Sequence, residues 1–139
     1  MVIDNRVENE SKEISFFKQE RGFHLEGIDV KKALQRLSID KATFILILRI
    51  FDSTYSSIVS KIKKILVDDK IEEARKLLHT LEGAAANINA DGVQLATYEL
   101  REAVKSGEKN FKPLIDHLDD RLKIVLKSIR SLDEHSKGK

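Results

Sequence analysis

The 139-residue chain is long enough for one domain with a substantial core, and its composition (41% hydrophobic, 35% charged) is typical of a helical protein with a charged surface. Its 25 basic and 23 acidic residues leave a net charge of +2, too small to predict a nucleic-acid partner. The absence of cysteine excludes disulfides, thiolate metal sites and a cysteine nucleophile. The longest strongly apolar run, 44–48, is far too short to span a bilayer, so we expect a cytoplasmic protein with no membrane insertion.

Residues 1–26 predict a flexible leader or linker, because the first 13 are polar and show no helical or strand period. A small apolar cluster near the end of this segment could form a short helix; it comprises Ile14, Phe16, Phe17 and Phe23. Residues 27–132 then carry one amphipathic pattern after another, and 133–139 form a polar tail. We therefore expect a single helical domain over residues 27–132.

Two aspartates mark the starts of the first two helices of this domain. Asp29 is a suitable N-cap for a short helix that ends near Leu37, and Asp40 for a helix over 41–67. The second helix would have about seven turns and a length of roughly 40 Å. Its apolar residues recur at spacings of three and four, which predicts a buried face made of Phe44, Leu48, Phe51, Tyr55, Ile58, Ile62 and Ile65.

A third helix is predicted over 70–88, with Asp68 and Asp69 supplying its N-cap and favourable negative charge. Asn89 tolerates a left-handed backbone conformation and would end it. The buried stripe reads Ile71, Ala74, Leu78, Leu81, Ala85 and Ile88. His79 lies beside this stripe rather than in it, so its imidazole would reach solvent at the edge of the core.

The remaining pattern predicts two more helices and no strands. Asp91 would cap a fourth helix that stops at Gly107, and Pro113 fits the first turn of a last helix that frays into the tail at 133–139. Short connections between long amphipathic helices favour antiparallel neighbours. The expected fold is all-α: an up-down-up-down antiparallel four-helix bundle with a short additional N-terminal helix.

The third predicted helix resembles a known signalling family. The run His79-Thr80-Leu81-Glu82-Gly83-Ala84-Ala85-Ala86-Asn87-Ile88-Asn89-Ala90 is similar to the signature of the histidine-containing phosphotransfer (HPt) domain, roughly His-x-Leu-Lys-Gly-small-small and then Gly-Ala. The lead-in Gly27-Ile28-Asp29-Val30-Lys31-Lys32-Ala33-Leu34-Gln35-Arg36-Leu37 resembles the start of HPt domains in hybrid sensor histidine kinases. The resemblance extends over about residues 27–130.

The resemblance implies a phosphorelay intermediate of a two-component system. His79 would accept a phosphoryl group from a receiver-domain aspartate, on Nε2 of its imidazole, and pass it to another receiver aspartate. The chain itself would need no cofactor, because the partner receiver supplies Mg²⁺. Such a carrier has no independent catalytic activity, is expected to be monomeric, and occurs as a separate protein or within a hybrid kinase. Its docking surface would be apolar with a charged rim, and would include Leu77 and Ala86.

The resemblance also assigns neighbours to His79. Gly83 would let a partner loop approach closely, and the alternative reading of this glycine is close helix packing. Gln94 matches a frequent family glutamine and would donate a hydrogen bond near the imidazole. Arg75 and Lys76, one turn before His79, are candidate cations for the phosphoryl group, or else ordinary solvated charges.

Three positions depart from the family pattern. Glu82 replaces the usual lysine, Asn89 replaces a glycine, and Arg101 stands where the family often has glutamate or glutamine. The two charge changes suggest a swapped pair across the third and fourth helices. In this hypothesis Arg101 supplies the cation that Glu82 does not, because a planar guanidinium suits a phosphoryl group.

Two alternative readings stay open. The domain could be a non-phosphorylated helical adaptor that docks receivers without efficient transfer, because Glu82 would oppose a phosphate. A nucleic-acid or membrane-surface binder would depend on Lys61, Lys63, Lys64 and the basic tail, and the small net charge argues against it. The other histidines, at 24, 117 and 135, are expected at the surface; a metal site at His117 lacks convergent ligands, so none is predicted.

Overall fold

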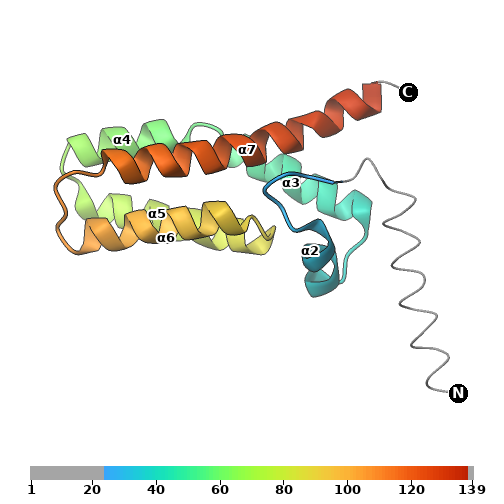
Figure 1. Ribbon diagram of the computed structural model, residues 1–139, viewed down its shortest axis with the longest axis horizontal. Coiled ribbons are helices and arrows are strands. Elements are labelled where there is room, and N and C mark those ends of the chain that lie inside the picture. The colour runs from blue at the N-terminus through green and yellow to red at the C-terminus, as the bar shows by residue number, and fades with distance from the viewer. Residues whose placement is uncertain (1–23, 138–139) are drawn as a thin grey trace, which may run out of the picture.

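The computed structural model describes residues 24–137, and side chains up to residue 132. The described chain is all helical: α2 (Val30–Leu37), α3 (Lys41–Tyr55), α4 (Ile58–Val67), α5 (Ile71–Asn87), α6 (Asp91–Lys105) and α7 (Lys112–Lys137). Figure 1 shows α4, α5, α6 and α7 lying side by side, with α2 and α3 at one end. The most extensive packing is between α5 and α6, followed by α6 with α7 and α4 with α5.

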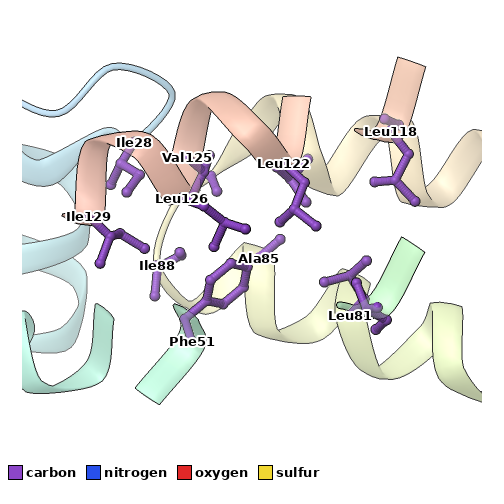
Figure 2. Packing of buried hydrophobic residues seen from close by; sticks show 14 of the residues in the cluster. Ile28, Phe51, Leu81, Ala85, Ile88, Leu118, Leu122, Val125, Leu126 and Ile129 are labelled. Carbon is purple, nitrogen blue, oxygen red and sulfur yellow. The ribbon is translucent and has the colours of Figure 1, made fainter. Parts of the chain in front are cut away.

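The core is made largely by the faces that the sequence pattern predicts, although three residues predicted to be buried are only partly so: Tyr55, Ile65 and Ile71. Phe51 of α3 points towards Ala85 of α5 and towards Ile88, which follows the end of α5 (Figure 2). Leu126 of α7 lies close to them. The largest fully buried side chains come from every described helix except α2, which adds the smaller buried residues Val30 and Ala33. Burying one such Leu, Ile or Phe side chain contributes about 1.5–3 kcal/mol, so the packed faces hold the helices together.

The prediction of one long helix over 41–67 is wrong, because the structure has two helices in this segment. α3 ends at Tyr55, and α4 begins at Ile58 after a turn at Ser56 and Ser57. Serine side chains compete for backbone hydrogen bonds, and paired small residues are common sites of helix breaks. By length and composition alone, Lys41–Val67 could cross a membrane. In the fold, the faces of both halves pack into the helical core.

Two predicted N-caps are confirmed and two are wrong. The Lys32 N–H donates to Asp29 Oδ1 at 3.1 Å, and the Thr43 N–H donates to Asp40 Oδ1 at 2.8 Å. By contrast, α5 has Lys70 at its N-cap and α6 has Ala90, each without a side-chain cap hydrogen bond. The chain reaches α5 through a left-handed Asp69 (φ 59°). Asp91 is instead the first residue of α6, where its charge still favours the helix dipole.

The ends of the domain differ from expectation. Leu25, assigned to the leader, is buried in the core, and the Ser128 hydroxyl donates to the Glu26 carbonyl at 2.7 Å. α7 continues to Lys137, so the segment predicted to fray is helical over most of its length. The apolar cluster at 14–23 lies outside the described residues. The packed domain therefore includes at least two residues before the predicted boundary.

Candidate functional site

His79 is exposed in the middle of α5. Leu78 on one side of it and Leu81 further along are fully buried, and they fix the rotation of the helix. Because α5 packs against α4 and α6, the opposite face of the helix is the one that carries His79 to solvent. The predicted position of the imidazole at the surface of a packed helix is confirmed.

Residues three and four positions from His79 share its face of α5. They are Arg75 and Lys76 on one side along the helix axis and Glu82 and Gly83 on the other. Lys76 and Gly83 are exposed, whereas Arg75 and Glu82 are partly buried. The surface around His79 is therefore mixed in charge, with one position that carries no side chain.

Gly83 borders open space. A Cβ atom built on this residue would meet no heavy atom within 4 Å outside the local helix. The alternative reading, that the glycine permits close helix packing, is wrong for the described residues. A mid-helix glycine costs roughly 1 kcal/mol relative to alanine, and nothing within the fold offsets that cost here. The open space instead leaves the surface next to His79 accessible.

Glu82 and Arg101 form an ion pair between α5 and α6. Arg101 Nη2 donates to Glu82 Oε1 at 2.9 Å and to Oε2 at 3.1 Å. The side chains are only 23% and 15% exposed, respectively, so the pair is shielded from water on most sides. The hydrogen bond to Glu82 raises the pKa of Arg101 above its ordinary value, although burial acts in the opposite direction. The predicted contact between the two exchanged charges is present.

Arg101 has a second neighbour that the sequence reasoning missed. Its Cζ lies 5.6 Å from the centroid of the Tyr98 ring, within the range of a cation–π contact. The spacing of three residues along α6 was a usable signal for it. Within the described part of the chain, Arg101 Nε is buried without a hydrogen-bond partner. The guanidinium is thus held by a carboxylate and a ring, with one donor unsatisfied.

The other candidate cations have different surroundings. Arg75 Nη1 donates to Glu72 Oε1 at 2.7 Å, a pair between residues three apart on the surface of α5. Exposed pairs of this kind contribute little to stability, so Arg75 can change partner at small cost. Lys76 is exposed, and its backbone carbonyl accepts a hydrogen bond from the Thr80 hydroxyl at 3.0 Å.

A groove lies between α4 and α5, and it shares Lys76 with the His79 face. It has a volume of about 540 Å³, and its lining includes Lys61 and Lys64 of α4 and Lys76, Leu77 and Thr80 of α5. His79 does not line the groove, because residues one or two positions apart on a helix point to different sides of it. The lining also contains Asp68 and Glu73, so its charges are mixed, with lysines in the majority.

The helix register does not bring Gln94 to the imidazole. α5 and α6 are antiparallel, because three residues connect them and Glu82 pairs with Arg101. The level of His79 therefore falls near Val104 on α6, ten residues from Gln94, or about 15 Å along the axis. A direct hydrogen bond between the Gln94 and His79 side chains is not expected from this geometry.

Asn89 ends α5 as predicted, and Arg36 of α2 caps the same end. Asn89 has a left-handed backbone (φ 55°), a conformation that asparagine tolerates where the family has glycine. Arg36 Nη2 donates to the carbonyls of Ala86 (3.1 Å) and Asn87 (2.6 Å) and to Asn89 Oδ1 (3.0 Å). A cation at this end also complements the helix dipole. No local pattern predicts this contact, because at least 50 residues separate its partners.

The two other histidines with described side chains, His24 and His117, are not part of this site. His24 and His117 are exposed, and the side chain of His135 lies outside the described set. From residue 24 to residue 132, no group of three or more His, Cys, Asp or Glu side chains could hold a metal ion.

Residues 47–131, more than half of the chain, match the Hpt domain family. The match spans α4 to α6 completely and most of α3 and α7, and it contains His79, Glu82, Gly83 and Arg101. No curated protein and no solved structure matches the chain. The lead-in at 27–37 lies outside the matched residues, so its likeness to hybrid-kinase domains stays a prediction.

The chain is a histidine phosphotransfer domain of the Hpt family. Such domains serve phosphorelays of two-component systems and interact there with receiver domains. The all-helical fold agrees with this membership.

Proposed function

We propose that this protein is a phosphorelay intermediate that uses His79 as its phosphoacceptor. His79 would take a phosphoryl group from the aspartyl phosphate of one receiver domain and deliver it to the aspartate of another. The observation that carries the proposal is the exposed imidazole on the matched helix, beside a glycine with open space around it. A carrier needs a reachable nucleophile on a rigid surface, because the partner supplies Mg²⁺ and the acidic pocket.

The proposal extends to the overall arrangement of the chain. The short connections 68–70 and 88–90, together with the packing of α4 to α7, support an up-down-up-down antiparallel four-helix bundle with α2 as an added N-terminal helix. We also propose that the domain acts as a monomer in the cytoplasm, without nucleic-acid binding or membrane insertion.

The receiver would dock across the His79 face. The α4–α5 groove offers Leu77 as an apolar contact and lysines that complement the acidic pocket of a receiver. Gly83 would lie under the closest part of the partner loop. Arg75 and Lys76 would lie within one helical turn of the transferred group.

A transfer assay with matched histidine variants tests the role of His79. A receiver charged with radiolabelled acetyl phosphate is mixed with the wild-type chain, with His79→Gln and with His117→Gln. We expect acid-labile label on the wild type and on His117→Gln, whose substituted residue is exposed on α7. His79→Gln should carry none. Equal labelling of both variants would refute the assignment of His79.

A second candidate function is a receiver-docking adaptor without efficient transfer. The Glu82 carboxylate one turn from His79 favours it, because it would repel a phosphoryl dianion. An adaptor would bind the charged receiver in a pull-down or by calorimetry, and the wild-type chain would acquire no label. Transfer of label to His79 would exclude it.

A further inference from the structure

The ion pair between Glu82 and Arg101 is placed where a phosphoryl group on His79 would meet it. Glu82 follows His79 by three residues, so the two side chains are neighbours on the surface of α5. Arg101 reaches Glu82 from α6 with a nitrogen–oxygen distance of 2.9 Å. Both side chains are mostly shielded from water, so the pair itself is screened less than two exposed charges would be, whereas the imidazole of His79 is open to solvent.

The hydrogen bonding of Arg101 is incomplete. Both of its bonds to Glu82 come from a single nitrogen, Nη2, rather than from two nitrogens in parallel. Nε is buried and has no acceptor among the described residues. A guanidinium carries five N–H donors, and a buried donor without an acceptor costs free energy. This arrangement leaves Arg101 able to gain from another acceptor, such as a phosphoryl oxygen.

Transfer would change the charge balance at this point. The lone pair of one imidazole nitrogen of His79 forms the new P–N bond as the P–O bond to the receiver aspartate breaks. The aspartate leaves as a carboxylate, and the other imidazole nitrogen keeps its proton. The three phosphoryl oxygens, with close to two negative charges, then lie one turn from Glu82. The Glu82 carboxylate and the phosphoryl group would then compete for the same cation, Arg101.

We propose that Arg101 exchanges partners during the relay. It pairs with Glu82 while His79 is free, and it moves to the phosphoryl oxygens when His79 is phosphorylated. Glu82 is then left as an unpaired carboxylate beside the phosphoryl group, which destabilises phosphohistidine relative to the receiver's aspartyl phosphate. The domain would thus be biased towards discharge to the next receiver. This inference rests on the proposed carrier function of His79.

The equilibrium constant for transfer between the receiver aspartate and His79 is a direct measure of the proposed bias towards discharge. The full chain is equilibrated with a charged receiver, and the ratio of phosphohistidine to aspartyl phosphate is compared between variants. We expect Glu82→Gln to raise this ratio by roughly 3- to 30-fold, the range for removing one like charge about one helical turn away at a partly shielded site. Arg101→Gln should lower it by a similar factor, and the double variant Glu82→Lys/Arg101→Gln should restore it to at least the wild-type value.

Asp52→Asn is the matched control. Asp52 is a partly shielded carboxylate that also pairs with an arginine of another helix, since Arg130 Nη2 of α7 donates to its Oδ1 at 2.9 Å, but neither residue belongs to α5 or α6. Its substitution should change the ratio by less than twofold. An unchanged ratio in Glu82→Gln, or the same change in Asp52→Asn, would overturn the proposal.

A second measurement does not depend on a receiver or on a substituted protein. Phosphoramidate phosphorylates histidine directly with loss of ammonia, and the wild-type chain labelled with ¹⁵N is followed by NMR during this reaction. The Arg101 Nε–H resonance should shift downfield as Nε gains an acceptor. No change at Arg101 while the His79 resonances shift would refute the exchange. A chain that reacts with phosphoramidate but takes no label from receivers would refute the carrier function instead.

Discussion

Substitution of Gly83 by alanine should move stability and transfer in opposite directions. The new Cβ enters open space, so no steric cost arises within the protein. Alanine in an exposed helix interior is more favourable than glycine by roughly 0.5–1 kcal/mol. For a chain of this length, that gain corresponds to a rise in Tm of about 2–5 °C. If a receiver loop docks on Gly83, the same methyl group obstructs it, and the rate of transfer to His79 should fall by about tenfold or more.

Two assays on the same preparation check this prediction. Thermal unfolding followed by circular dichroism gives the change in Tm, and rapid-quench transfer from a charged receiver gives the rate. Gly92→Ala is the control, because Gly92 is in the first turn of α6 and its new Cβ would meet only the flexible Arg121 side chain, at 3.2 Å. This control should leave the transfer rate unchanged. A Gly83→Ala protein that is stabilised yet transfers at the wild-type rate would refute the reasoning about docking.

Three further predictions concern the scaffold. Arg36→Ala should lower the free energy of unfolding by roughly 1.5–3 kcal/mol in urea titrations, because the end of α5 loses its charged hydrogen-bond donor. An unchanged free energy of unfolding would mean that water fully replaces the Arg36 guanidinium, against this prediction. Leu118→Ala, at a fully buried position, should cost about 2–5 kcal/mol in the same titrations, and a loss below 1 kcal/mol would contradict the packing. Asp40→Ala should lower stability at neutral pH, because the Thr43 hydrogen bonds hold the pKa of Asp40 below its ordinary value of 3.8. The contribution of Asp40 to stability is present above pH 3.8 and is lost as pH falls through the lower folded-state pKa. The difference in free energy of unfolding between Asp40→Ala and the wild type should therefore shrink in acid, and a difference that stays constant with pH would contradict the prediction.

The buried faces could be predicted because each helix repeats its own apolar spacing. Leu78, Leu81 and Ala85 illustrate this, since a local period of three and four residues determines which side of α5 is buried. The same spacing placed His79 at the surface. It also placed Glu82 one turn from His79, and the exchanged charge at Arg101 suggested the contact that the structure contains.

The features that the sequence did not reveal depend on contacts distant in the chain or on small energy differences. Arg36 meets the end of α5 only after α2 has packed against it. The apolar spacing of α3 and α4 is continuous across Ser56 and Ser57, so the pattern alone gave no sign of the break. Leu25 is a single apolar residue in a polar stretch, without a period that would mark it as buried.

The relay itself tests the central claim most directly. A receiver charged with radiolabelled phosphate is incubated with a second, uncharged receiver in the presence of the wild-type chain, His79→Gln or His117→Gln. The account predicts that label reaches the second receiver through the wild type and through His117→Gln, with a transient acid-labile pool on the chain. Label that reaches the second receiver equally well with His79→Gln would contradict it.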